Sequence, residues 1–174
     1  MRKLAMIAVP ALVMVASFGA VQAAEDGVLY IRPAMQGGIN TAVNELWDIG
    51  NNAMSDSGGI DPVQMDEAKW TRLETAATLL EAESRKMAEA QVIHAALPGE
   101  GSAVEPGAYS MEDVQTYIDA DPQAFRLLAA AMATHSGKIA AAAKARDAET
   151  AGLLVGEVDQ VCEACHAKYW YPEG

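Results

Sequence analysis

Cysteine is scarce in this chain, whose 174 residues contain only two, Cys162 and Cys165. This count excludes a small domain held together by several disulfides. Both cysteines belong to the run "DQVCEACHAKYWYPEG" at residues 159–174, which also contains His166. A disulfide between them would close a very small loop and would stabilise the fold little. The pair therefore indicates a chemical role rather than a cross-link.

Basic residues are also few, with 12 Lys and Arg against 24 Asp and Glu, so the net charge is −12. An acidic surface is repelled by nucleic acid and by anionic membranes, and the charge argues against both as partners. It favours partner proteins that have basic docking surfaces.

Long apolar runs are absent except near the N-terminus. Residues 1–23 begin with two basic residues, continue with the uncharged run "LAMIAVPALVMVASFGA" and end in small residues, which is typical of a secretory signal peptide cut after Ala23. A membrane anchor is the alternative, but the run is short for a span and contains Pro10. We therefore expect an exported, soluble mature domain over 24–174, without a membrane span and with a net charge of −14, because the segment removes two basic residues and no acidic one.

Strand-like alternation of useful length is absent too, and the apolar residues recur with a helical period between breaks rich in Gly, Pro, Asp and Ser. The pattern predicts long helices over 33–54, 62–96 and 148–170, another that begins at Pro122, and a short one over 111–119. Predicted N-caps are Asp61, Ser110 and Asp121. Four long amphipathic helices with mostly short connections favour an all-α fold, an antiparallel up-and-down four-helix bundle.

The helical stripes also predict which side chains form the core. The first helix carries Pro33, where it is expected to begin or to kink. Predicted core residues on the four stripes include Ile39, Val43, Leu46, Trp70, Leu73, Leu80, Met87, Phe125, Ile139, Val158 and Tyr169.

The spacing Cys162-Glu163-Ala164-Cys165-His166 is the C-x-x-C-H pattern of c-type haem attachment. Two thiols one helical turn apart can bond to the two vinyl groups on one edge of a haem, and the adjacent histidine can bind the iron. A thioredoxin-like motif would lie near a βαβ pattern, which this chain lacks. A zinc site would need further ligands, for which only His94 and His135 remain. A structural disulfide would leave the histidine unexplained.

At these residues the chain resembles the class II c-type cytochromes, the cytochrome c prime family. "CEACHAKYW" is similar to the C-x-x-C-H-x-x-Tyr ending of that family, and "AAAAKARDAETAGLLVGEVDQVCEACH" is similar to its linkage of the third and fourth helices. The family has a four-helix bundle with the motif near the end of the last helix. Many members have a basic residue four positions after the histidine, where this chain has Trp170.

The resemblance implies a role for each residue of the motif. Cys162 and Cys165 would hold one covalent haem c by thioether bonds, and His166 would be the proximal iron ligand. The protein would then be a periplasmic electron-transfer cytochrome that meets redox partner proteins. Family members are often dimers through their first two helices, so a homodimer is also implied.

The opposite face of the iron raises the question of a sixth ligand. Low-spin relatives supply a methionine from the first helix, and here Met35, three residues after Arg32, is the candidate. Met54 and Met132 are weaker candidates, and His135 is more easily interpreted as a hydrogen-bonded core residue. If Met35 is only a core methionine, the iron would be five-coordinate and would bind nitric oxide or carbon monoxide. No paired acid and base are visible in the sequence, so no enzyme activity is expected.

Overall fold

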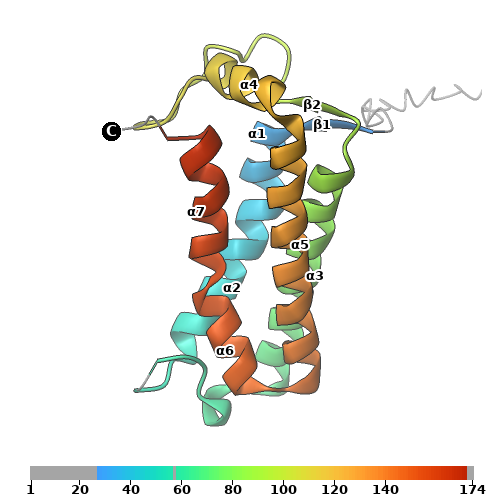
Figure 1. Ribbon diagram of the computed structural model, residues 1–174. Helices are drawn as coiled ribbons and strands as arrows, with labels where there is room; N and C mark the ends of the chain where they lie inside the picture. The colour runs from blue at the N-terminus through green and yellow to red at the C-terminus, as the bar shows by residue number, and fades with distance from the viewer. Residues whose placement is uncertain (1–26, 57, 172–174) are drawn as a thin grey trace, which may run out of the picture.

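The computed structural model describes residues 27–56 and 58–171 (Figure 1). The signal peptide expected over 1–23 lies outside the described residues. In chain order the elements are β1 (Val28–Tyr30), α1 (Ile31–Ala34), a π-helical segment (Met35–Ile39), α2 (Asn40–Asn52), a 3₁₀ turn (Pro62–Gln64), α3 (Glu67–Glu89), β2 (Val92–His94), α4 (Met111–Ala120), α5 (Pro122–Ala145), α6 (Ala148–Gly156) and α7 (Val158–Tyr169). The fold is therefore all-α, apart from one pair of three-residue strands.

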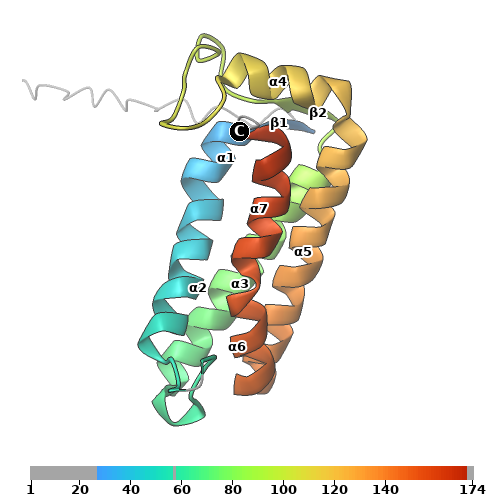
Figure 2. The same cartoon turned by 60° about the vertical axis from the view of Figure 1, so that its left-hand side comes forward.

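The long helices run alongside one another, and α4 lies across one end of them (Figures 1 and 2). The most extensive packing is between α3 and α5, and α2 packs against α3 while α6 and α7 pack against α5. The predicted stripes face inward, because Leu46, Leu73, Leu80, Ile139 and Val158 are fully buried. Within the described residues, no helix combines the length and the apolar character needed to cross a membrane.

The first helix begins at Ile31, so Pro33 sits in the first turn, where its missing N–H costs nothing. The distortion lies further on, in the π-helical segment, where Gly37 has φ −97° and ψ −107°. The prediction that the helix begins or kinks at Pro33 is therefore wrong. Such segments insert one residue into the helix and are frequent at functional sites.

The predicted start of the second helix is wrong, because α3 begins at Glu67 rather than at Pro62. Asp61 Oδ1 accepts a hydrogen bond from Val63 N at 2.9 Å, but this cap starts only the 3₁₀ turn. Met65 then adopts an extended backbone and is buried, and Asp66 caps α3 by accepting from Lys69 N at 2.8 Å. The extended, buried Met65 therefore separates the 3₁₀ turn from α3.

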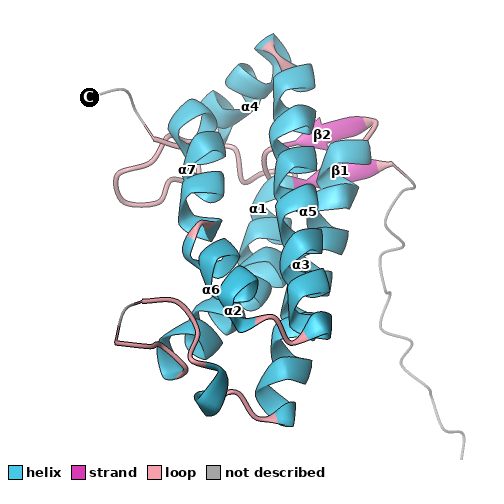
Figure 3. Cartoon of the chain, turned by 60° about the horizontal axis from the view of Figure 1, so that its bottom comes forward, coloured by secondary structure: helices cyan, strands magenta, loops and turns pink. Residues whose placement is uncertain are grey.

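The predicted end of this helix is also wrong, because α3 ends at Glu89 rather than near residue 96. Residues 92–94 form strand β2, which pairs in parallel with β1 in the register Val28 to Val92 (Figure 3). Arg126 Nε of α5 donates to Ala90 O at 2.9 Å and so occupies a carbonyl at the end of α3. Strand β1 and Arg126 lie far from this segment along the chain. Their hydrogen bonds replace those that a further helical turn would make.

The predicted starts of α4 and α5 are confirmed, whereas the last predicted helix is divided. Ser110 caps α4, and Asp121 caps α5 by accepting from Ala124 N at 3.0 Å. The helix expected over 148–170 is divided at Glu157 into α6 and α7. Gly152 on α6 allows the segment between α2 and the 3₁₀ turn to pack closely, since a Cβ there would lie 2.4 Å from Ile60 N.

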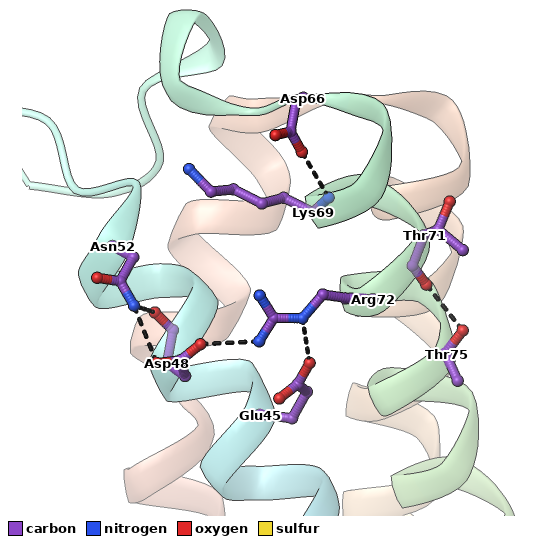
Figure 4. Close-up of polar contacts among 8 residues, drawn as sticks. All are labelled: Glu45, Asp48, Asn52, Asp66, Lys69, Thr71, Arg72 and Thr75. Carbon is purple, nitrogen blue, oxygen red and sulfur yellow. Dashed lines mark hydrogen bonds and ion pairs between the residues drawn. The ribbon is translucent and has the colours of Figure 1, made fainter.

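An ion-pair network on the surface joins α2 to α3 (Figure 4). Arg72 of α3 donates from Nη2 to Asp48 Oδ2 at 2.8 Å and from Nε to Glu45 Oε1 at 2.5 Å. These two hydrogen-bonded carboxylates raise the pKa of Arg72. Because all three side chains are partly exposed, the network orients the two helices more than it stabilises the fold.

Candidate functional site

A cavity of about 400 Å³ lies between the first helix, α3, α5 and α7. This volume is in the range typical of ligand-binding pockets, roughly 300–1,000 Å³. The residues that line it are Arg32, Met35, Gln36, Ile39, Asn40, Val43, Asn44, Trp47, Ser84, Met87, Glu105, Leu128, Ala129, Met132, Asp159, Val161, Cys162, Glu163, Cys165, His166, Trp170 and Tyr171. The structure therefore brings all four predicted site residues, the two cysteines, His166 and Met35, to one cavity.

Both thiols lie on α7, one helical turn apart, and are half-buried without a disulfide between them. Burial raises the pKa of Cys162 to about 11, with Asp159 adding to the effect. Burial likewise raises the pKa of Cys165 to about 11, and Cys162 adds to it. This is the opposite of the electropositive surroundings that activate a catalytic or redox-active cysteine. The surroundings of the pair therefore do not match a thioredoxin-like site.

His166 follows the second thiol and also lines the cavity. Burial lowers its pKa below the usual 6.5, although Glu163 and Asp159 act in the opposite direction. Its imidazole is therefore neutral at neutral pH, which is the form that binds a metal ion. The ring lies near two aromatic side chains, with centroid distances of 6.3 Å to Trp170 and 5.8 Å to Tyr171.

Met35 reaches the cavity from the π-helical segment and is half-buried there. From this segment onward, Ile39, Val43 and Trp47 continue the cavity wall at intervals of four residues. The first helix therefore presents one continuous face to the cavity, with the thioether near its N-terminal end. A role for Met35 as a metal ligand remains a prediction.

The other methionine and histidine candidates differ in whether they line the cavity. Met132 lines the cavity from α5, whereas Met54 is 53% exposed and does not line it. His135 also lies outside the cavity, with Nε2 2.8 Å from Leu154 O. His94 is exposed, but it lies in β2 and stacks on Tyr30 at 5.3 Å, rather than at the end of a helix.

Two cavity residues that the sequence did not single out for the site are Ser84 and Met87, both on α3 and both buried. Met87 was predicted only as a core residue, and its distance along the chain from the cysteine motif left no signal for a site role. Trp47 lies at the cavity edge with 38% of its surface exposed.

Unsatisfied polar atoms provide a test of what the cavity can hold. Arg32 pairs through Nη1 with Glu100 at 3.4 Å and through Nη2 with Glu105 at 3.2 Å, but its buried Nε has no partner among the described residues. Buried Ser84 Oγ has none either. A mostly apolar cavity with a thiol pair, a neutral imidazole and unpaired donors fits a large, largely apolar group with polar substituents. These residues fit a haem.

Comparison with known proteins agrees with this chemistry. A family model described as "Cytochrome C'" matches residues 64–170, which is more than half of the chain. The matched segment includes the motif on α7 but begins after Met35. Searches of curated proteins and of solved structures gave no match.

Proposed function

The chain belongs to the cytochrome c′ family and is a haem protein, and we propose that it is a periplasmic electron-transfer protein that carries one covalent haem c. One observation carries the proposal: the thiols of Cys162 and Cys165, the imidazole of His166 and the thioether of Met35 line the same cavity. In this proposal the first helix, α3, α5 and the α6–α7 pair act as the four helices of an up-and-down bundle around the haem.

Each residue has a distinct task. When bound, the haem supplies an iron that exchanges one electron between its ferric and ferrous states. Cys162 and Cys165 would hold the group on α7, and neutral His166 would bind its iron. Met35 of the first helix would be a second ligand, whose soft sulfur would favour the reduced state. Apolar side chains from α3 and α5 exclude water, which keeps the surroundings of the metal similar in both oxidation states.

Visible spectroscopy of the purified, haem-loaded protein tests this proposal. With His166 and Met35 both bound, we expect low-spin spectra with split bands in the ferrous form. A potentiometric titration should follow a one-electron curve, about 59 mV for each tenfold change in the ratio of oxidised to reduced protein. Broad high-spin spectra would instead support a five-coordinate protein that binds nitric oxide or carbon monoxide. The buried, unpartnered Ser84 in the cavity is the observation that favours this alternative.

We also propose that partner proteins approach the cavity edge with a basic surface. Asp159 and Glu163, one turn apart on α7, are exposed and line the cavity, while exposed Asn40, Asn44 and Trp47 on α2 line it without charge. Carboxylates at the edge attract a cationic partner and accelerate its encounter at low ionic strength.

The pair Asp159→Asn and Glu163→Gln tests this docking surface with two small redox reagents. Removing the two charges should slow oxidation by tris(1,10-phenanthroline)cobalt(III), a cation, several-fold at low salt and should speed oxidation by ferricyanide, an anion. Stopped-flow kinetics at increasing ionic strength should show both differences disappear. The matched control, Glu89→Gln with Glu149→Gln, removes the same charge away from the cavity and should change little. Equal effects of the two variants would mean that overall charge, rather than this surface, controls the encounter.

A further inference from the structure

Ser84 is an unusual residue in this cavity. It lies on α3 and is 1% exposed, and its Oγ has no hydrogen-bond partner among the described residues. Among the described residues the other buried serine is Ser136 on α5, whose Oγ donates to Met132 O at 2.8 Å. Ser136 follows the common pattern in which a helical serine bonds to the carbonyl four residues earlier, and Ser84 departs from it.

A buried hydroxyl without a partner costs free energy, so an unpartnered one calls for an explanation, such as a bound ligand or water. The other cavity residues of α3 and α5 are Met87, Leu128, Ala129 and Met132, and all are apolar. These walls offer no acceptor for Ser84 and few partners for an ordered water, which needs two to four polar contacts. The hydroxyl is therefore positioned for a molecule that enters the cavity.

Ser84 lies on α3, a helix that packs against the π-helical segment carrying Met35. The approach is close, because a Cβ added to Gly38 would lie 2.8 Å from Cγ of Glu83, the residue next to Ser84. The helix that carries the serine thus adjoins the segment that carries Met35, whereas His166 reaches the cavity from α7.

We propose that Ser84 donates a hydrogen bond to a neutral diatomic ligand, such as carbon monoxide or nitric oxide, that occupies the cavity in place of the Met35 thioether. This inference rests on the proposed haem function. A carboxylate is a poorer occupant, because a single neutral hydroxyl in an apolar wall does not compensate for the burial of a charge. Arg32, whose Nε is unpaired, offers a better position for such a group. A small neutral molecule loses little hydration and needs only one donor.

Carbon monoxide binding to the ferrous, haem-loaded protein tests the role of Ser84. The measurements are the infrared C–O stretching frequency and the affinity, in the unmodified protein and in a Met35→Ala background where the thioether cannot compete. A donated hydrogen bond polarises the bound molecule and lowers the stretching frequency. Ser84→Ala should raise the frequency and weaken binding roughly 3- to 10-fold, the range of a single neutral hydrogen bond. Ser84→Thr, which keeps the hydroxyl, should preserve the lower frequency.

Ser136→Ala is the matched control, because it removes a buried hydroxyl that does not line the cavity. It should leave the frequency unchanged, and an equal shift in this control would overturn the proposal by showing a general packing effect. An unchanged frequency in Ser84→Ala would also overturn it while leaving the haem function intact. Haem content is measured first on the same samples. Its absence from the unmodified protein would overturn the proposed function as well as the role of Ser84.

Discussion

A variant with Cys162→Ala and Cys165→Ala is expected to contain no covalently bound haem. Both thiols line the cavity from one turn of α7, and no other cysteine exists in the chain to replace them. Thioether bonds are not broken by denaturation, so the unmodified polypeptide should keep its haem through denaturing electrophoresis and acid–acetone extraction. Mass spectrometry should show the haem adduct in the unmodified protein and the bare polypeptide in the variant.

The single variants and a control sharpen this test. Each single replacement should leave at most one thioether bond and a haem that is held less firmly. Val161→Ala removes a side chain from the same cavity wall without removing a thiol, and it should retain covalent haem. Because a group that binds only the folded state stabilises it, the double variant should also unfold at a lower temperature. Extraction of free haem from the unmodified protein would contradict covalent attachment.

Replacing Met35 with alanine is expected to convert the iron from low spin to high spin. The thioether favours ferrous iron, so its loss should lower the reduction potential, by a sizeable part of the roughly 0.8 V range that axial ligands control. The near-infrared band from sulfur-to-ferric-iron charge transfer should disappear, and carbon monoxide should bind more readily. The fold should survive, because Met35 is only half-buried and its truncation costs less than the roughly 2–5 kcal/mol of a fully buried methionine.

Met132→Ala is the matched control for Met35. Met132 is also a half-buried methionine of the cavity wall, but it comes from α5. Its replacement should leave the spin state unchanged and shift the potential only slightly. If Met132→Ala causes the change and Met35→Ala does not, the sixth ligand comes from α5. If the unmodified protein is already high spin, Met35 only packs in the wall, and binding of small gases becomes the better function.

The sequence by itself determined the features that depend on neighbours a few residues away. The spacing of Cys162, Cys165 and His166 requires only one helix to bring them to one place, and α7 does so. The caps at Ser110 and Asp121 depend on backbone N–H groups three residues later, and both are present. Apolar residues three and four apart share a helix face, so the helical stripes predicted the core.

Only the tertiary structure decided the features that depend on distant partners. Helix α3 ends at Glu89 because β1 and Arg126 supply alternative partners for the backbone that follows it. Likewise, Ser84 and Ser136 are the same residue type on similar helices, yet Ser84 Oγ has no hydrogen-bond partner among the described residues and Ser136 Oγ has one. Local pattern cannot separate the two serines, because hydrogen bonding and burial are set by whatever the fold brings opposite each side chain.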